Sequence, residues 1–146
     1  MNYGKAGEQM FSLYSKDLGY QVEDLSSNPA YWDLDIDFRL TNPRTSQCRT
    51  FEVKTDTHIQ STGNLYIELT NIHSKQGKGW FEFCKADYLA YIDYRSRALY
   101  IIDMEELRAH ISSHSFSQSK CGDDSTGLLV PLATLTSLPS FQSHKI

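Results

Sequence analysis

The sequence lacks the features that would place it in a membrane, in a secretory pathway or among zinc proteins. No run approaches the roughly 18 apolar residues of a membrane-spanning helix, and the first residues hold no apolar stretch typical of a secretory signal. Cys48, Cys84 and Cys121 are odd in number and form no CxxC pair. They predict free thiols in a reducing compartment. We therefore expect a cytoplasmic protein.

Positive charge is also scarce. The 14 Lys and Arg residues are outnumbered by 18 Asp and Glu, which gives a net charge of −4. This balance counts against a protein that coats nucleic acid, because phosphate contacts need basic side chains. It leaves open a site that concentrates carboxylates within a local basic rim.

The 146 residues, 40% of them hydrophobic, predict a single globular domain over residues 1–146. Residues 5–18 carry apolar side chains at helical spacing, and Gly19 follows as a C-cap. The expected apolar face consists of Ala6, Met10, Leu13, Tyr14 and Leu18. Glu8 lies about 150° from the centre of that face, so it should face solvent or a cleft.

Two segments alternate between polar and apolar residues, at 33–40 and 48–55, and a turn-rich stretch joins them. This pattern predicts an antiparallel hairpin. Further strands are expected at 64–69, 88–94, 98–102 and 127–132, with a helix that Asp103 caps and that runs to about Ile111. Residues 112–126 are expected to be a mobile polar loop and the tail after Ser137 to fray. The fold class is α+β or mixed α/β around one central sheet flanked by helices.

The hairpin register decides which charged residues meet. If Leu40 pairs with Arg49, Asp37 lies opposite Glu52, about 5 Å away at Cβ, and Asp35 lies opposite Lys54. A slip of two residues would instead place Asp35 opposite Glu52. We prefer Asp37.

Two facing carboxylates destabilise a sheet unless something neutralises them. A divalent cation would do so, and carboxylate oxygens suit Mg²⁺. Such an ion would polarise a phosphodiester and supply a hydroxide nucleophile. Lys54 could orient the attacking water or stabilise charge in the transition state.

These residues resemble a known signature. Ile36-Asp37-Phe38 followed by Phe51-Glu52-Val53-Lys54 looks like the PD-(D/E)XK nuclease motif, with Ile36 in place of the family's nominal proline. Glu8 matches the helical acid that is common upstream in this family. The resemblance covers roughly residues 5–69.

The resemblance implies a restriction-endonuclease-like fold and hydrolysis of DNA phosphodiester bonds with Mg²⁺ or Mn²⁺. It assigns Asp37 and Glu52 as metal ligands and Lys54 as the catalytic cation. A single-domain DNA endonuclease or resolvase-like enzyme that uses one or two Mg²⁺ ions is the best interpretation, and the form of DNA that it cuts stays open. The resemblance also implies a homodimer, because many small nucleases cut one strand with each subunit. A binding module on the same fold that does not cut, or a phosphohydrolase of small nucleotides, are the alternatives.

Several further residues are candidates for supporting roles. Glu68 follows Tyr66 on the same side of its strand and could reach the metal or a water, although an ordinary exposed Glu explains it equally well. The candidates for DNA contacts are Lys5, Arg44, Asn64, Lys75 and Lys78. Trp80 is expected in the core and not as a platform for bases.

Overall fold

The computed structural model describes residues 1–146 apart from the side chain of Lys75. The helical elements are α1 (Tyr3–Asp17), α2 (Pro29–Trp32), α3 (Ile59–Thr62), η1 (Lys75–Gly77), α4 (Trp80–Phe83), α5 (Met104–Ser113) and α6 (Leu132–Leu135). The strands are β1 (Gln21–Asp24), β2 (Phe38–Thr41), β3 (Cys48–Asp56), β4 (Asn64–Asn71), β5 (Tyr88–Asp93), β6 (Ala98–Asp103), β7 (Ser117–Cys121), β8 (Ser125–Pro131) and β9 (Gln142–Lys145).

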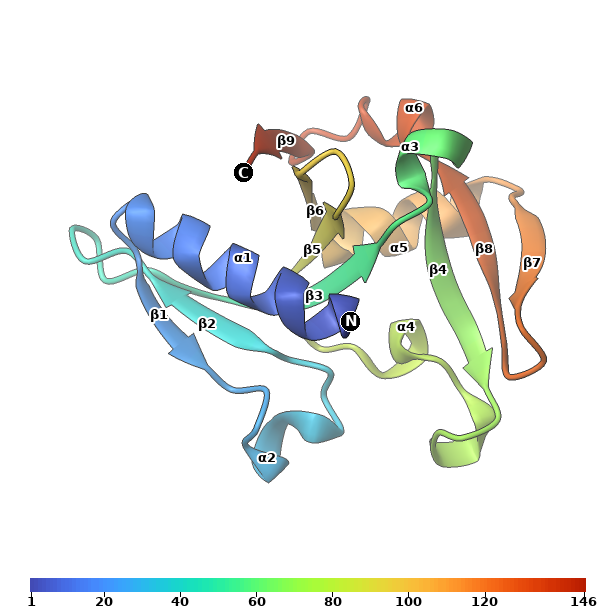
Figure 1. Ribbon diagram of the computed structural model, residues 1–146, viewed down its shortest axis with the longest axis horizontal. Coiled ribbons are helices and arrows are strands. Elements are labelled where there is room, and N and C mark those ends of the chain that lie inside the picture. Colours follow the sequence, from blue (N-terminus) through green and yellow to red (C-terminus); the bar gives the residue numbers. More distant parts are fainter.

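The strands form two sheets, where the sequence predicted one. The larger is six-stranded, in the order β1-β2-β3-β5-β6-β9. Its β3 and β5 run parallel and its other neighbours antiparallel. The smaller sheet has the order β4-β8-β7 and stands on the side away from β1 and β2 (Figure 1). The predicted mixed α+β class, with a central mixed sheet flanked by helices, is confirmed.

Helix α1 confirms the helix predicted at 5–18, but it turns a different face to the sheet. The buried positions are Gly7, Phe11 and Ser15, whereas Leu13 and Leu18 are 63% and 58% exposed. A Cβ at Gly7 would overlap the hydroxyl of Thr55 on β3. The helix therefore approaches β3 along its small residues, a preference that the apolar spacing did not reveal.

The hairpin register is confirmed, because Leu40 pairs with Arg49 and Phe38 with Phe51. The first strand is shorter than predicted. Asp35 lies in a turn after α2 with a left-handed φ of 49°, so residues 33–35 do not belong to the ladder. The reason is local, since Asn28 caps α2 by accepting from the N–H of Ala30, and a helical turn precedes the strand.

The C-terminal third contains more structure than the sequence suggested. Residues 112–126, predicted as a polar loop, include the end of α5 and all of β7, which pairs with β8. The tail forms β9 and pairs with β6. The predicted cap of α5 is confirmed, because the N–H of Glu106 donates to Oδ1 of Asp103 at 3.0 Å. Within the described residues, no helix has the length and hydrophobicity needed to cross a bilayer.

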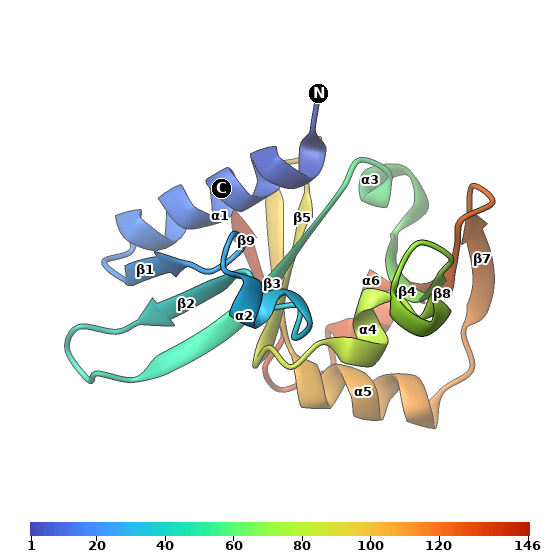
Figure 2. The same cartoon turned by 90° about the horizontal axis from the view of Figure 1, so that it is seen from below.

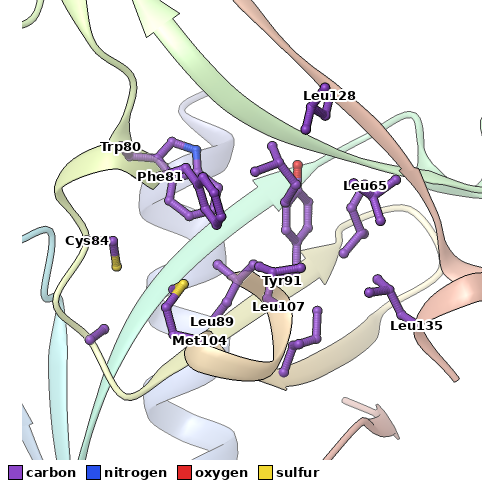
Figure 3. Close-up of a cluster of buried hydrophobic side chains, with 14 of the residues drawn as sticks. Leu65, Trp80, Phe81, Cys84, Leu89, Tyr91, Met104, Leu107, Leu128 and Leu135 are labelled. Carbon is purple, nitrogen blue, oxygen red and sulfur yellow. The ribbon is translucent and has the colours of Figure 1, made fainter. Parts of the chain in front are cut away.

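Two apolar clusters lie on opposite faces of the larger sheet. One packs under α1 and includes Phe11, Phe51 and Val53. The other fills the space toward the smaller sheet and α5, with Trp80 and Tyr91 among its members (Figure 3). Strand β3 lies between them: its Phe51 and Val53 belong to the first cluster, and the alternate side chains point the other way.

Candidate active site

The turn into β2 holds Asp37 beside Glu52. The N–H of Asp37 donates to the carbonyl of Phe51 at 2.9 Å. Its carboxylate Oδ2 accepts the N–H of Val53, also at 2.9 Å. These two bonds extend the register of the hairpin to the residue before the start of β2, so Asp37 lies next to Glu52, as the sequence predicted.

Glu52 is buried and carries an unpaired oxygen. Only 3% of the residue is exposed. Its Oε1 lies 2.6 Å from Nζ of Lys54, while Oε2 is buried without a hydrogen-bond partner among the described residues. An unpartnered buried carboxylate oxygen is costly, and it marks a position where a positive group would be stabilised.

Lys54 stands between this carboxylate and the aromatic ring of Trp80. Its Nζ lies 5.2 Å from the centre of the Trp80 ring, a cation–π geometry. The Lys54 side chain keeps 31% of its surface exposed. The ammonium is thus held on two sides and still reaches open space.

The charges in this cluster shift one another's pKa values. Burial raises the pKa of Glu52 well above its usual range; Lys54 offsets part of the shift and Asp37 adds to it. Burial also disfavours the charged form of Lys54, but the charge and hydrogen bond of Glu52 outweigh it and raise the pKa of Lys54. Lys54 therefore stays positively charged, and any further positive charge nearby would stabilise the ionised form of Glu52.

Asp35 reaches the same cluster from the turn and not from the strand. Burial raises its pKa, Lys54 lowers it, and Asp37 and Glu68 raise it again. Asp35 lines the main cleft together with Lys54. The predicted pairing of Asp35 opposite Lys54 on the ladder is wrong, although the two side chains do interact.

Glu8 approaches from α1. Its pKa is raised, first by burial and then by the neighbouring Asp37, while Lys5 and Lys54 lower it. Glu8 and Lys5 line a groove beside α1 that is separate from the main cleft. The structure therefore places Glu8 near enough to Asp37 for the two charges to interact.

Glu68 approaches from β4, on the smaller sheet. Its Oε1 accepts the backbone N–H of Trp80 at 3.3 Å, and its Oε2 accepts from Nδ2 of Asn71 at 3.4 Å. Gly79 permits this close approach, because a Cβ there would lie 2.6 Å from Cγ of Glu68. Trp80 thus positions Glu68 through its backbone and Lys54 through its ring.

A cleft of about 1020 Å³ opens between the two sheets. Figure 2 shows β3 and the β4-β8-β7 sheet, whose residues line this cleft, across from each other. Of the predicted DNA-contact residues, Asn64 and Lys78 line this cleft. Lys120 on β7 also lines it. No sequence pattern pointed to Lys120, because the segment that carries it was expected to be a loop.

The other predicted contact residues lie elsewhere. Arg44 belongs to the turn between β2 and β3, which points away from the smaller sheet (Figure 1). Lys5 lies in the groove beside α1. The side chain of Lys75 falls outside the described part of the chain.

The carboxylates suit a divalent cation by their chemistry. Asp37 and Glu52 offer oxygen ligands of the kind that Mg²⁺ and Mn²⁺ prefer, and Oε2 of Glu52 is buried without a hydrogen-bond partner among the described residues. The described residues contain no preformed group of three or more His, Cys, Asp or Glu side chains around a metal position. Mg²⁺ commonly completes its shell with water and substrate phosphate.

No protein-family model and no curated protein sequence matches the chain. Among solved structures, the chain is similar to the bacterial homing endonuclease I-Ssp6803I, with a TM-score of 0.52 and 13% sequence identity. The likeness covers 70% of this chain and 68% of that one. At this identity the likeness concerns the fold alone. The chain therefore has a nuclease-like fold.

Proposed function

We propose that the protein is a metal-dependent DNA endonuclease that hydrolyses phosphodiester bonds, with Asp37 and Glu52 as metal ligands and Lys54 as the catalytic cation. The observation that carries the proposal is the buried Glu52, with one unpartnered oxygen, held between Asp37 and Lys54. The match of these residues to the PD-(D/E)XK motif and the nuclease-like fold support the same function.

The cluster has more negative than positive charge. Lys54 neutralises one carboxylate, while Asp35 and Asp37 add their charges nearby. Buried carboxylates are tolerated where opposite charge and hydrogen bonds compensate them. When bound, Mg²⁺ or Mn²⁺ would supply the remaining positive charge, polarise the phosphodiester and lower the pKa of a water nucleophile.

The chain's own residues would then do three things. Asp37 and Glu52 would bind and orient the metal ion. The hydrogen bonds of the hairpin backbone hold both residues in place. Lys54, held by its cation–π contact with Trp80, would stabilise the negative charge that develops on the phosphoryl oxygens or orient the attacking water. Glu8 and Glu68 act as auxiliary acids from α1 and β4, the first beside Asp37 and the second across the cleft.

The cleft supplies a place for DNA. Asn64, Lys78 and Lys120 line its walls and could contact phosphates of the backbone, which would confine binding to a few positions in a protein of net charge −4. The proposed substrate is DNA of a particular structure, as a resolvase-like enzyme would cut. A homodimer would let each subunit cut one strand.

A supercoiled plasmid tests the proposal directly. The purified protein should nick or linearise it with Mg²⁺ or Mn²⁺, and EDTA should abolish the products. Asp37→Asn should weaken metal binding, so excess Mg²⁺ should restore part of its activity.

A binding module on the same fold is the second candidate. The observation in its favour is that the described side chains form no metal group of three. If no form of DNA is cut with either metal while DNA binding persists, this second function replaces the first.

A further inference from the structure

A smaller hollow adjoins the main cleft at Asp35. It measures about 400 Å³ and its lining is Trp32, Asp33, Asp35, Ser74, Gln76 and Phe83. Asp35, Ser74 and Phe83 also line the main cleft, so the two spaces share part of their lining. A volume of this size falls within the range of small-molecule pockets. We call it the Trp32 pocket.

Trp32 presents its ring to this pocket in a fixed orientation. The residue is 60% exposed, yet its Nε1–H donates to the carbonyl of Ser26 at 2.9 Å. The backbone around it is also anchored, because the N–H of Lys85 donates to the carbonyl of Leu34 at 2.8 Å. An exposed indole held in this way loses little conformational freedom when a flat ligand stacks on it.

The lining of the pocket suits a flat ring with polar groups at its edge. Trp32 and Phe83 supply aromatic surface, and Gln76 and Asp35 supply polar groups for such an edge. This is the chemistry of a nucleobase.

We infer that the Trp32 pocket binds one unpaired nucleobase of the DNA strand whose phosphate lies at Asp37, Glu52 and Lys54. The inference rests on the proposed nuclease function and narrows its substrate. A base must leave the duplex stack to enter the pocket, and this costs least where it is already unpaired. The preferred substrate is therefore DNA with unpaired nucleotides next to the cut.

Binding to two labelled DNA duplexes tests the inference. One duplex is fully paired and the other has the same ends with a central run of unpaired nucleotides. Affinities are measured by fluorescence anisotropy with Ca²⁺ in place of Mg²⁺. Trp32→Ala should weaken binding of the unpaired DNA about 5- to 150-fold, the effect of losing one base–aromatic stack, and should hardly change binding of the paired duplex.

Two variants guard this result. Trp32→Phe keeps an aromatic face and should restore most of the affinity. Leu18→Ala removes a side chain of similar exposure, 58%, at the C-terminal end of α1, and should change neither affinity. Tryptophan emission should be quenched by unpaired DNA in the wild type and in Trp80→Phe, but not in Trp32→Phe.

The outcomes separate the inference from the proposed function. Equal losses for both duplexes, or none, overturn the inference, even where the wild type cuts DNA with Mg²⁺. Trp32-dependent binding without any cleavage supports the pocket and overturns only the nuclease activity. Quenching by a free nucleoside monophosphate but not by the unpaired DNA overturns the inference and assigns the pocket to small nucleotides.

Discussion

The two faces of β3 have opposite characters. Phe51 and Val53 point into the cluster under α1, whereas Glu52 and Lys54 point toward Trp80 and the cleft. Side chains of a strand alternate between its faces, so whatever fixes one face fixes the direction of the other. The apolar packing under α1 is thus what orients the charged pair.

The two faces also differ in what burial does to them. Burial of the phenylalanine and valine side chains is favourable. Burial of Glu52 opposes its charge, and the raised pKa of this residue expresses that opposition. The apolar face therefore stabilises the fold. The charged face lowers its stability, and a functional role for the charges would explain why they are buried there.

The largest expected effect comes from the apolar face. Phe51 is 8% exposed, and its ring lies 5.2 Å from that of Phe11 and 5.3 Å from that of Tyr88. Phe51→Ala should lower the free energy of unfolding by about 3–5 kcal/mol, measured by urea denaturation. The exposed Leu13→Ala is the control and should change it by less than about 0.5 kcal/mol. An equal loss in both variants would contradict the packing role.

The next effect comes from the charged face. Lys54→Ala should reduce DNA cleavage by about 10²–10³-fold, the typical loss for one preorganised donor, while metal binding stays close to wild type. Glu52→Gln should instead weaken metal binding. Lys145→Ala, which removes a lysine on β9 that lies outside the cleft lining, is the control. Wild-type cleavage by the Lys54 variant would remove the catalytic assignment.

A smaller effect tests how tightly α1 presses on β3. Gly7→Ala should destabilise the protein by about 1–3 kcal/mol, because the added methyl group meets the Thr55 hydroxyl. In a Thr55→Ala background the same change should cost less, and a double-mutant cycle by thermal denaturation measures the difference. Additive effects would mean that the two residues do not meet.

The smallest effect concerns DNA held at the rim of the charged face. The double change of Lys75 and Lys78 to Ala should weaken DNA binding and flatten its dependence on salt by about one to two counterions. Affinities measured from low to moderate salt give the slope, with Lys145→Ala for comparison. An unchanged slope would place these lysines outside the binding surface.

Local patterns predicted the hairpin because its determinants are local. Alternation over 48–55 identified β3, and the pairing of Leu40 with Arg49 gave the register that places Asp37 beside Glu52. The metal, the cleavage reaction and the roles of these residues remain predictions. The charged cluster was visible in the sequence because three of its members belong to one short hairpin.

Other elements depended on contacts that no local pattern contains. The alternation at 33–35 resembles a strand, but the turn after α2 gives Asp35 a left-handed φ. Strand β7 is polar and acquires its structure by pairing with β8. Trp80 was expected in the core, and it is buried there, but its second position against Lys54 required the folded chain.

The hydroxyl of Tyr91 bonds to the backbone of β4, which is the outer strand of the smaller sheet on the cleft side. This hydroxyl donates to the carbonyl of Tyr66 and accepts the N–H of the same residue. The Tyr91 side chain thus makes the two hydrogen bonds that a neighbouring strand would make. Further along β4, the N–H of Gly79 donates to the carbonyl of Leu69. An outer strand with free backbone groups invites a strand from another chain. Tyr91 and Gly79 occupy this part of the β4 edge, so copies of the protein that associate through backbone pairing would use β7, β1 or β9 instead.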